Sequence, residues 1–273
     1  MELRYALLRR RSNRSKKTQM GIMSLTWLQT ARRLLPHLGR LSREIRPTIH
    51  LSSASDLRSE QLREQGIKAI LWDVDGTLMA HHADRVDPAV ADVFDALLAA
   101  PDLQHAIVSN CQETRFFQLA RIFPGVPIVF GYETSLGPAF RVQRGMDTSW
   151  RGPGAGRDQT GAQKLSPIRK PSARLVEAAL AELNMSSEPE AVMLVGDQYF
   201  TDIVSANLAG IRSVKVPTLK QASFPIPVKL SQRLEAVLYR LKHGWPKIGW
   251  PAHNCVRDHP NCRSHRVKEP DFT

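Results

Sequence analysis

Cysteines and long hydrophobic runs are nearly absent from this sequence of 273 residues. Its three cysteines, Cys111, Cys255 and Cys262, are too few for a disulfide framework and are typical of a reducing compartment. No stretch approaches the roughly 18 continuous apolar residues of a membrane-spanning helix. The N-terminus also lacks the apolar segment of a secretory signal. We therefore expect a cytoplasmic protein without a spanning helix.

Acidic residues are missing almost completely from residues 1–43, where Glu2 is the only one. The basic residues of this segment are Arg4, Arg9, Arg10, Arg11, Arg14, Lys16, Lys17, Arg32, Arg33, Arg40 and Arg43. The whole chain has a formal net charge of +12. This charge favours an anionic partner, such as a phosphorylated substrate or an acidic membrane surface, with nucleic acid as the less favoured alternative.

Residues 1–24 are interpreted as a basic disordered tail. The alternatives are an organelle transit peptide, which would place the protein in a mitochondrion or plastid, and sequence upstream of a start at Met20 or Met23. Residues 25–55 are predicted to be a basic amphipathic helix over 25–41, followed by a linker. This helix either packs on its own domain or lies on an anionic membrane, on the inner membrane face.

Strand and helix patterns alternate between residues 56 and 220. Strands are predicted at 67–72, 104–108, 126–130, 191–195 and 211–216, and helices at 56–65, 88–100, 112–123, 171–183 and 201–209. This order predicts an α/β fold, in which a Rossmann-like parallel sheet is flanked by helices. Residues 131–167, rich in Gly, Pro, Arg, Gln and Ser, are interpreted as a long flexible insertion. Residues 221–273 are predicted to hold a basic amphipathic helix at 227–242 and an irregular tail.

Polar residues stand at the ends of the predicted strands. They are Asp73, Asp75 and Thr77 after the first strand, Ser109 and Asn110 after the second, Lys170 before a helix, and Asp197 and Asp202 after the fourth. The carboxyl ends of parallel strands meet at one edge of a sheet, so we expect these side chains to gather there. Asp73 and Asp75 are two residues apart and would face the same side of an extended chain.

Carboxylates, hydroxyls and a lysine together suit the chemistry of phosphoryl transfer. One carboxylate can act as a nucleophile and form an aspartyl-phosphate, while a second protonates the leaving oxygen and then activates water. A hydroxyl and a lysine can neutralise the phosphoryl oxygens. Clustered carboxylates repel one another unless a cation lies among them, and Mg²⁺ is the hard ion that prefers oxygen ligands.

These residues resemble the four motifs of the haloacid dehalogenase-like (HAD) phosphohydrolase superfamily. The motifs stand here as Asp-Val-Asp-Gly-Thr from Asp73, Val-Ser-Asn ending at Asn110, Arg-Lys-Pro around Lys170, and Val-Gly-Asp-Gln-Tyr-Phe-Thr-Asp ending at Asp202. The resemblance covers residues 66–218 apart from the insertion. It implies the HAD fold and an Mg²⁺-dependent phosphatase.

The resemblance also implies a role for each polar residue. Asp73 would be the nucleophile, and Asp75 would be the general acid and base. The phosphate would be bound by Thr77, Ser109, Asn110 and Lys170. Mg²⁺ would be held by Asp73, the backbone carbonyl of Asp75 and Asp197, with Asp202 acting on the metal indirectly, by orienting one of these ligands or through a water molecule.

A narrower match lies in Gly-Asp-Gln-x-x-Thr-Asp, followed by Ala-Asn-x-Ala-Gly at 206–210. It resembles subclass IIIA of the superfamily, in particular the phosphatidylglycerophosphatase group of bacteria, plastids and mitochondria. That group converts phosphatidylglycerophosphate to phosphatidylglycerol on a membrane surface. The chain departs from the group at Gly76 and Cys111, where Asn is usual, and in the insertion. The alternatives are a soluble sugar or nucleotide phosphatase and a non-catalytic nucleic-acid-binding or scaffold protein.

The segment between Asp73 and Ser109 has room for one predicted helix but not for a large cap domain. A site without a cap is open to bulky phosphoesters, such as lipid head groups. The two predicted basic amphipathic helices, at 25–41 and 227–242, would suit reversible, peripheral attachment to an anionic bilayer.

Overall fold

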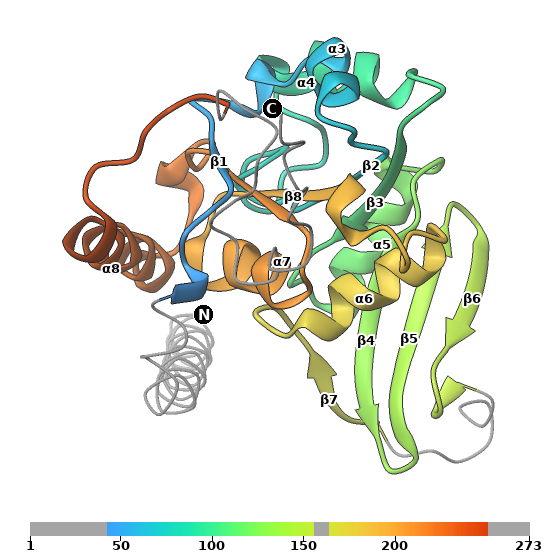
Figure 1. The fold of residues 1–273 in the computed structure, drawn as a ribbon. Coiled ribbons are helices and arrows are strands. Elements are labelled where there is room, and N and C mark those ends of the chain that lie inside the picture. The colour runs from blue at the N-terminus through green and yellow to red at the C-terminus, as the bar shows by residue number, and fades with distance from the viewer. Residues whose placement is uncertain (1–42, 156–163, 251–273) are drawn as a thin grey trace, which may run out of the picture. The chain divides into compact units, whose positions relative to one another are not determined.

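A nine-stranded sheet runs through the residues that the computed structural model describes, 43–155 and 164–250. The strands are β1 Ile49–His50, β2 Ala69–Trp72, β3 Gln104–Val108, β4 Ile128–Thr134, β5 Gly137–Arg144, β6 Asp147–Arg151, β7 Lys164–Ile168, β8 Val192–Gly196 and β9 Arg212–Lys215. Their order is β1-β9-β8-β2-β3-β4-β5-β6, with β7 paired to β4. The pairs from β1 to β4 are parallel, which confirms the predicted α/β architecture (Figure 1).

Helices cover both faces of this sheet (Figure 1). They are α3 Ser59–Glu64, α4 Pro88–Leu98, α5 Glu113–Ile122, α6 Ala173–Glu182, α7 Val204–Leu208 and α8 Ile226–His243, with the short turns η2 Ala54–Asp56, η4 Pro189–Ala191, η5 Tyr199–Ile203 and η6 Gln221–Ser223. Alternate residues of β2 enter two cores. Ile70 and Trp72 lie in the core that includes α4 and α5, and Ala69 and Leu71 in the core that includes α6 and α7. Because both faces are covered, the whole strand is buried and reads as an apolar run.

The register of the central strands brings their carboxyl ends to one edge. Trp72 pairs with Ile107 of β3 and with Val195 of β8. The backbone N–H of Asp73 then donates to the carbonyl of Val195 at 3.0 Å. Between β2 and β3 the described chain holds one helix, α4, and no separate domain. The edge that carries the polar residues is therefore not covered by a domain inserted at this point.

The predicted flexible insertion at 131–167 is instead an antiparallel extension of the sheet, so this prediction is wrong wherever the segment is described. β5 pairs with β4 and β6, and β7 pairs with the other side of β4. The alternation of β5 is hard to recognise because Gln143 is buried beside Val142. Gln143 donates to the Gly145 carbonyl at 2.8 Å and accepts from the Thr148 hydroxyl at 2.6 Å, so its burial leaves no polar atom unsatisfied.

Residues 44–55, predicted as linker, belong to the same unit as the sheet, residues 44–273. Ile49 pairs with Val214 of β9, and the N–H of Leu51 donates to the Lys215 carbonyl at 3.0 Å. A strand of two residues is too short to show a period in the sequence. The next helix, α3, begins at Ser59 and not at the predicted residue 56, because Asp56 closes a capping box with Ser53 in η2.

The C-terminal helix α8 confirms the prediction at 227–242. The helix predicted at 201–209 consists of a π-helical turn, η5, followed by α7. The predicted helix at 25–41, the basic tail at 1–24 and the irregular tail after residue 250 lie outside the described residues. Of the helices within the described ranges, none combines the length and the apolar character needed to cross a membrane.

Candidate active site

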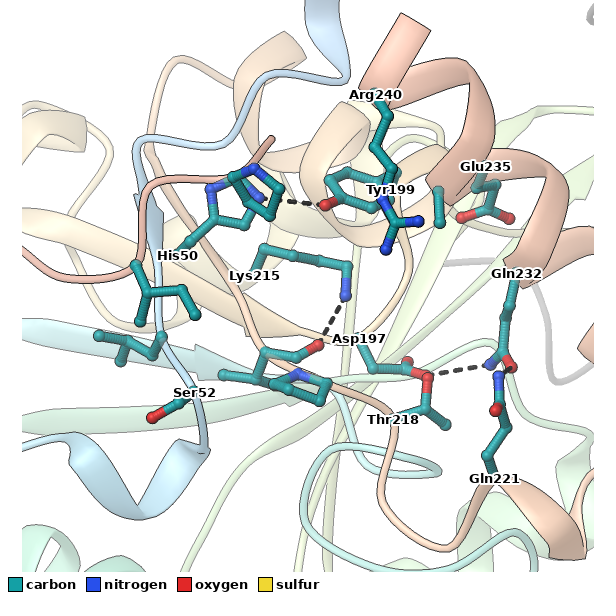
Figure 2. A pocket seen from close by; sticks show the side chains of 16 residues that line it. His50, Ser52, Asp197, Tyr199, Lys215, Thr218, Gln221, Gln232, Glu235 and Arg240 are labelled. Carbon is teal, nitrogen blue, oxygen red and sulfur yellow. Dashed lines mark hydrogen bonds between the residues drawn. The ribbon is translucent and has the colours of Figure 1, made fainter. Parts of the chain in front are cut away.

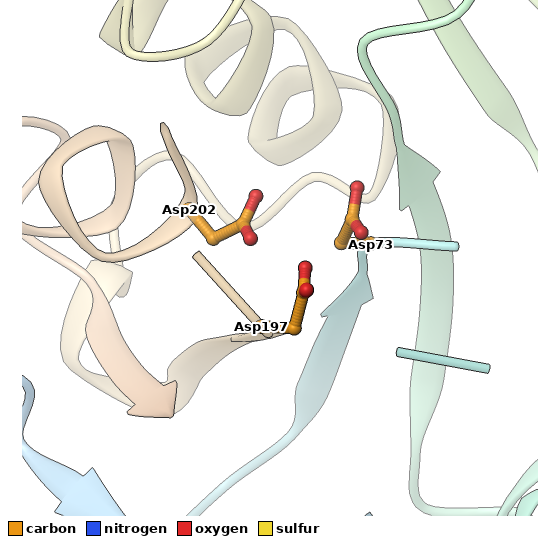
Figure 3. A group of neighbouring side chains, drawn as sticks. All are labelled: Asp73, Asp197 and Asp202. Atoms are coloured by element: carbon orange, nitrogen blue, oxygen red, sulfur yellow. The ribbon is translucent and has the colours of Figure 1, made fainter. Parts of the chain in front are cut away.

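Three buried carboxylates meet at the carboxyl edge of the sheet (Figure 3). Asp73 follows β2, Asp197 follows β8, and Asp202 lies in η5. These residues are 6%, 3% and 1% exposed. One oxygen from each carboxylate lies within 4.8 Å of the others. Like charges this close in a buried place need positive charge among them, and oxygen ligands at this spacing can hold a hard divalent cation.

Lys170 supplies part of that positive charge. It follows β7, and its Nζ lies 2.6 Å from Asp73 Oδ1 and 2.6 Å from Asp202 Oδ1. Burial lowers the pKa of Lys170, but the carboxylates of Asp202 and Asp73 outweigh this and leave it above the ordinary value. Burial raises the pKa of Asp73 to about 7, although Lys170 opposes the shift. Lys215 adds a second positive charge that interacts with Asp197 and Asp202, so two ammonium groups face three carboxylates and balance them only in part.

Asp197 shows where further positive charge is missing. Its Oδ2 accepts hydrogen bonds from the Thr218 hydroxyl at 2.7 Å and from Gln232 Nε2 at 3.1 Å. Its Oδ1 is buried and has no hydrogen-bond partner among the described residues. Burial, followed by Asp202 and Asp73, raises the pKa of Asp197 well above its usual range. Because an unpaired buried carboxylate oxygen is costly, a cation at Oδ1 would fit this site.

Two glycines allow the carboxylates to approach one another. A Cβ at Gly196 would overlap the side chain of Asp202. Gly76 has a φ of +97°, and a Cβ there would lie 2.8 Å from Asp197 Oδ2. The second oxygen of Asp202 accepts from the backbone N–H of Gln198 at 2.9 Å, so the η5 turn fixes this carboxylate.

Asp75 lies outside the carboxylate cluster and is held by a different partner. Its Oδ1 is 2.7 Å from Arg115 Nη2 and also accepts from the backbone N–H of His82 at 3.1 Å. Arg115 lies on α5 and is buried. In the sequence, Arg115 is an ordinary basic residue of an amphipathic helix, so its pairing with Asp75 gave no local signal. The predicted metal contact through the Asp75 backbone carbonyl stays a prediction.

The residues predicted to bind phosphate lie around Asp73. Thr77 is fully buried, and its Oγ1 is 3.4 Å from Asp73 Oδ2. Ser109 is buried directly after β3. Asn110 instead contacts Lys170: its Nδ2 donates to the Lys170 carbonyl at 3.0 Å, and its Oδ1 accepts from the Lys170 N–H at 2.7 Å. Asn110 therefore positions the backbone that presents Lys170, while its predicted contact with phosphate stays a prediction.

A pocket of about 460 Å³ opens beside Asp197, between the ends of β1 and β9 and helix α8 (Figure 2). Lys215 lies in it and donates to the Val216 carbonyl at 2.7 Å. His50 Nε2 is 3.1 Å from the Tyr199 hydroxyl. Burial and then Lys215 lower the pKa of His50 to about 4. The sequence prediction did not include this pocket, because it joins segments from both ends of the described chain.

Comparison with known proteins gives one family match, to the HAD-hydrolase-like family over residues 167–222. This range contains Lys170, Asp197 and Asp202. No curated protein matches the sequence. The crystal structure of an uncharacterized protein from Listeria monocytogenes serotype 4b is similar over 64% of this chain and 99% of that chain, with 14% identity and a TM-score of 0.35. The family match supports the assignment of this chain to the HAD-like hydrolases and to phosphatase-type hydrolysis.

Proposed function

We propose that the chain is a magnesium-dependent phosphomonoester hydrolase that forms an aspartyl-phosphate on Asp73. The observation that carries this proposal is the buried cluster of Asp73, Asp197 and Asp202 around Lys170. A nucleophilic carboxylate, an ammonium that binds it and carboxylates beside the neighbouring strand that can hold a divalent cation are parts that hydrolysis through a phosphoenzyme needs.

Each residue then has a defined task. Lys170 holds Asp73 Oδ1 and orients the carboxylate for attack on phosphorus, which displaces the leaving oxygen. Asp75 donates a proton to that oxygen and later removes one from the attacking water, which regenerates Asp73 and releases phosphate. Because Arg115 binds Asp75 Oδ1, we assign the transferred proton to Oδ2.

Asp73, Asp197 and the backbone carbonyl of Asp75 would hold the magnesium, with Asp202 beside them. Bound there, magnesium would neutralise charge on the phosphoryl oxygens. The unpartnered Oδ1 of Asp197 supports this assignment.

The substitution Asp73→Asn tests the nucleophile. It is nearly isosteric, so the fold should be kept while phosphate release from p-nitrophenyl phosphate with Mg²⁺ is abolished. Asp102→Asn is the matched control, because this exposed aspartate pairs with Arg63 on the surface, away from the carboxylate cluster. Turnover of Asp73→Asn at the wild-type rate would overturn the assignment. Release that is unaffected by EDTA would overturn the metal dependence.

We infer phosphatidylglycerophosphate as the substrate, with phosphatidylglycerol as the product. The subclass IIIA resemblance supports this choice, as does the absence of a domain between β2 and β3 that would restrict access to a bulky ester. The test is phosphate release from this lipid in mixed micelles, beside a panel of sugar phosphates and nucleotides. Release from the soluble esters alone would discard the lipid and keep the chemistry. No release from any ester, with tight binding to nucleic acid, would favour a binding protein.

A further inference from the structure

Helix α8 turns its apolar side chains away from the sheet. Ile226, Leu230, Leu234, Val237 and Leu241 recur every three or four residues and are between 49% and 79% exposed. Just beyond the helix, Trp245 is 76% exposed, while Ile248, 68% exposed, lines the pocket that also contains His50 and Glu235. The α8 stripe consists of Ile226, Leu230, Leu234, Val237 and Leu241. Elsewhere in the described ranges, the exposed large hydrophobic residues are Leu136 and Met146.

The opposite face of α8 is polar and buried. Its buried residues are Gln232, Glu235 and Tyr239. Gln232 donates to Asp197, Glu235 Oε2 accepts from the backbone N–H of Phe200 at 3.2 Å, and Tyr239 stacks on Tyr199 with ring centroids 4.7 Å apart. A helix that packs on its own domain normally buries its apolar face. The attachment of α8 therefore does not use the α8 stripe, and these apolar residues need another explanation.

The charged residues at the surface of α8 and of the short segment after it have one sign. From 226 to 248 the only acid is Glu235, which is buried, while Lys229, Arg233, Arg240, Lys242 and Lys247 are basic. The Arg240 guanidinium lies 4.3 Å from the ring centre of Trp245. Apolar residues bordered by lysine and arginine, with a tryptophan at the margin, are the composition of helices that lie in an anionic lipid surface.

We propose that the α8 stripe is a docking surface for an anionic lipid bilayer. Two other occupants are disfavoured by charge. A second copy of this chain would bring the same basic border against itself. Residues 1–43 have Glu2 as their only acid, so they would also place like charges together. An anionic bilayer complements both the apolar stripe and its border.

The role that we give to this surface rests on the proposed lipid substrate. Docking would hold the carboxyl edge of the sheet, which carries Asp73, near the phosphate head groups of the bilayer. The link is short: Gln232 on the inner face of α8 contacts Asp197 directly. Docking itself can be measured without turnover, so the two proposals can fail separately.

The test is co-sedimentation of the full chain with vesicles of phosphatidylcholine alone and of phosphatidylcholine with phosphatidylglycerol. The wild-type chain should bind the anionic vesicles and release from them as salt is raised. The variant Leu230→Gln/Leu234→Gln/Leu241→Gln should bind them at least about tenfold more weakly, since it removes apolar area from the interface. The control Leu136→Gln/Met146→Gln changes the exposed hydrophobic residues outside α8 and should bind as wild type. A second variant, Arg233→Gln/Lys247→Gln, should reduce the binding and its salt dependence.

Circular dichroism and the urea midpoint of the triple variant check that it folds as wild type. Equal binding of a folded triple variant and wild type would overturn the proposal, as would a wild type that ignores anionic vesicles. A wild-type dimer that becomes a monomer in the triple variant would assign the α8 stripe to self-association instead. Vesicle binding without phosphate release from any ester would support docking and count only against the proposed chemistry.

Discussion

The substitution Arg115→Met would leave Asp75 without its ion-pair partner while keeping much of the apolar bulk of the side chain. Arg115 Nη2 lies 2.7 Å from Asp75 Oδ1, and Nη1 donates to the Ala83 carbonyl at 2.6 Å and to Gln118 Oε1 at 2.9 Å. The side chains of Arg115 and Asp75 are 3% and 17% exposed. Water can therefore replace little of what Arg115 provides.

The expected cost follows from this burial. Removing one partner of a buried ion pair costs about 3–5 kcal/mol, because the remaining charge is left uncompensated. The partial exposure of Asp75 and the packing of methionine both reduce this, so we expect a loss of about 3 kcal/mol in the free energy of unfolding. A domain with about 5–15 kcal/mol of stability would still fold, and its activity could be measured.

The kcat of Arg115→Met for two different esters should distinguish a loss of proton transfer from a general loss of folded enzyme. If Arg115 positions Asp75 as the general acid, kcat should fall by about 10²-fold for an alkyl phosphate, whose leaving oxygen needs a proton. The fall should be much smaller for p-nitrophenyl phosphate, whose leaving group departs without one. Urea unfolding and kcat for both esters are the measurements, with Arg63→Met as the control, since it breaks an exposed ion pair with Asp102. A wild-type urea midpoint, or equal losses for both esters, would refute the reasoning.

Two further substitutions test the surroundings of the carboxylates: Gly196→Ala tests their packing, and Glu235→Gln tests a buried titratable group beside them. Gly196→Ala should lower Mg²⁺-dependent turnover about 10²-fold, because its Cβ would displace Asp202; Gly125→Ala, whose Cβ would meet nothing within 4 Å, is the control for turnover. Burial raises the pKa of Glu235 from 4.5 to about 7. Between these two pH values the folded chain keeps a proton on Glu235 that the unfolded chain has released. The free energy of unfolding should therefore fall as the pH rises from about 4.5 to about 7, by up to about 3 kcal/mol. The urea midpoint of Glu235→Gln, measured from pH 4.5 to 7, should lack the part of this fall that comes from Glu235. An identical pH dependence of the midpoint in the variant and in the wild type would contradict the prediction.

Most of the candidate site was predictable because its residues stand at the ends of strands. Asp73 and Asp197 directly follow the buried runs of β2 and β8, and a parallel sheet brings such positions together whatever the details of packing. The partners that orient these residues were not predictable. Arg115, Gln232 and Thr218 acquire their roles only through contacts made far along the chain, and each is an unremarkable residue in its own segment.

The fold was predicted least well where hydrogen bonds replace an apolar pattern. β5 and β6 pair through the backbone, and β5 carries Pro138, Arg141 and Gln143 among its apolar residues, so no clear alternation is visible. β1 is only two residues long and is defined by its pairing with β9. In both cases the neighbouring strand decides the conformation, and a single segment of sequence does not contain that neighbour.

Helix α8 shows the same limit for a helix, because an amphipathic pattern identifies an apolar face without saying what that face contacts. The usual expectation would bury Leu230 and Leu234, yet the buried face carries Gln232 and Glu235. The orientation of α8 is set by two polar groups of the site that need hydrogen-bond partners. Asp197 Oδ2 accepts from Gln232, and the N–H of Phe200 in η5 needs Glu235 as its acceptor. Turning α8 over would bury leucines but leave both groups without these partners beside a cluster that already carries excess negative charge. The polar contacts that complete the site thus direct the α8 stripe outward, toward the bilayer that we propose it binds.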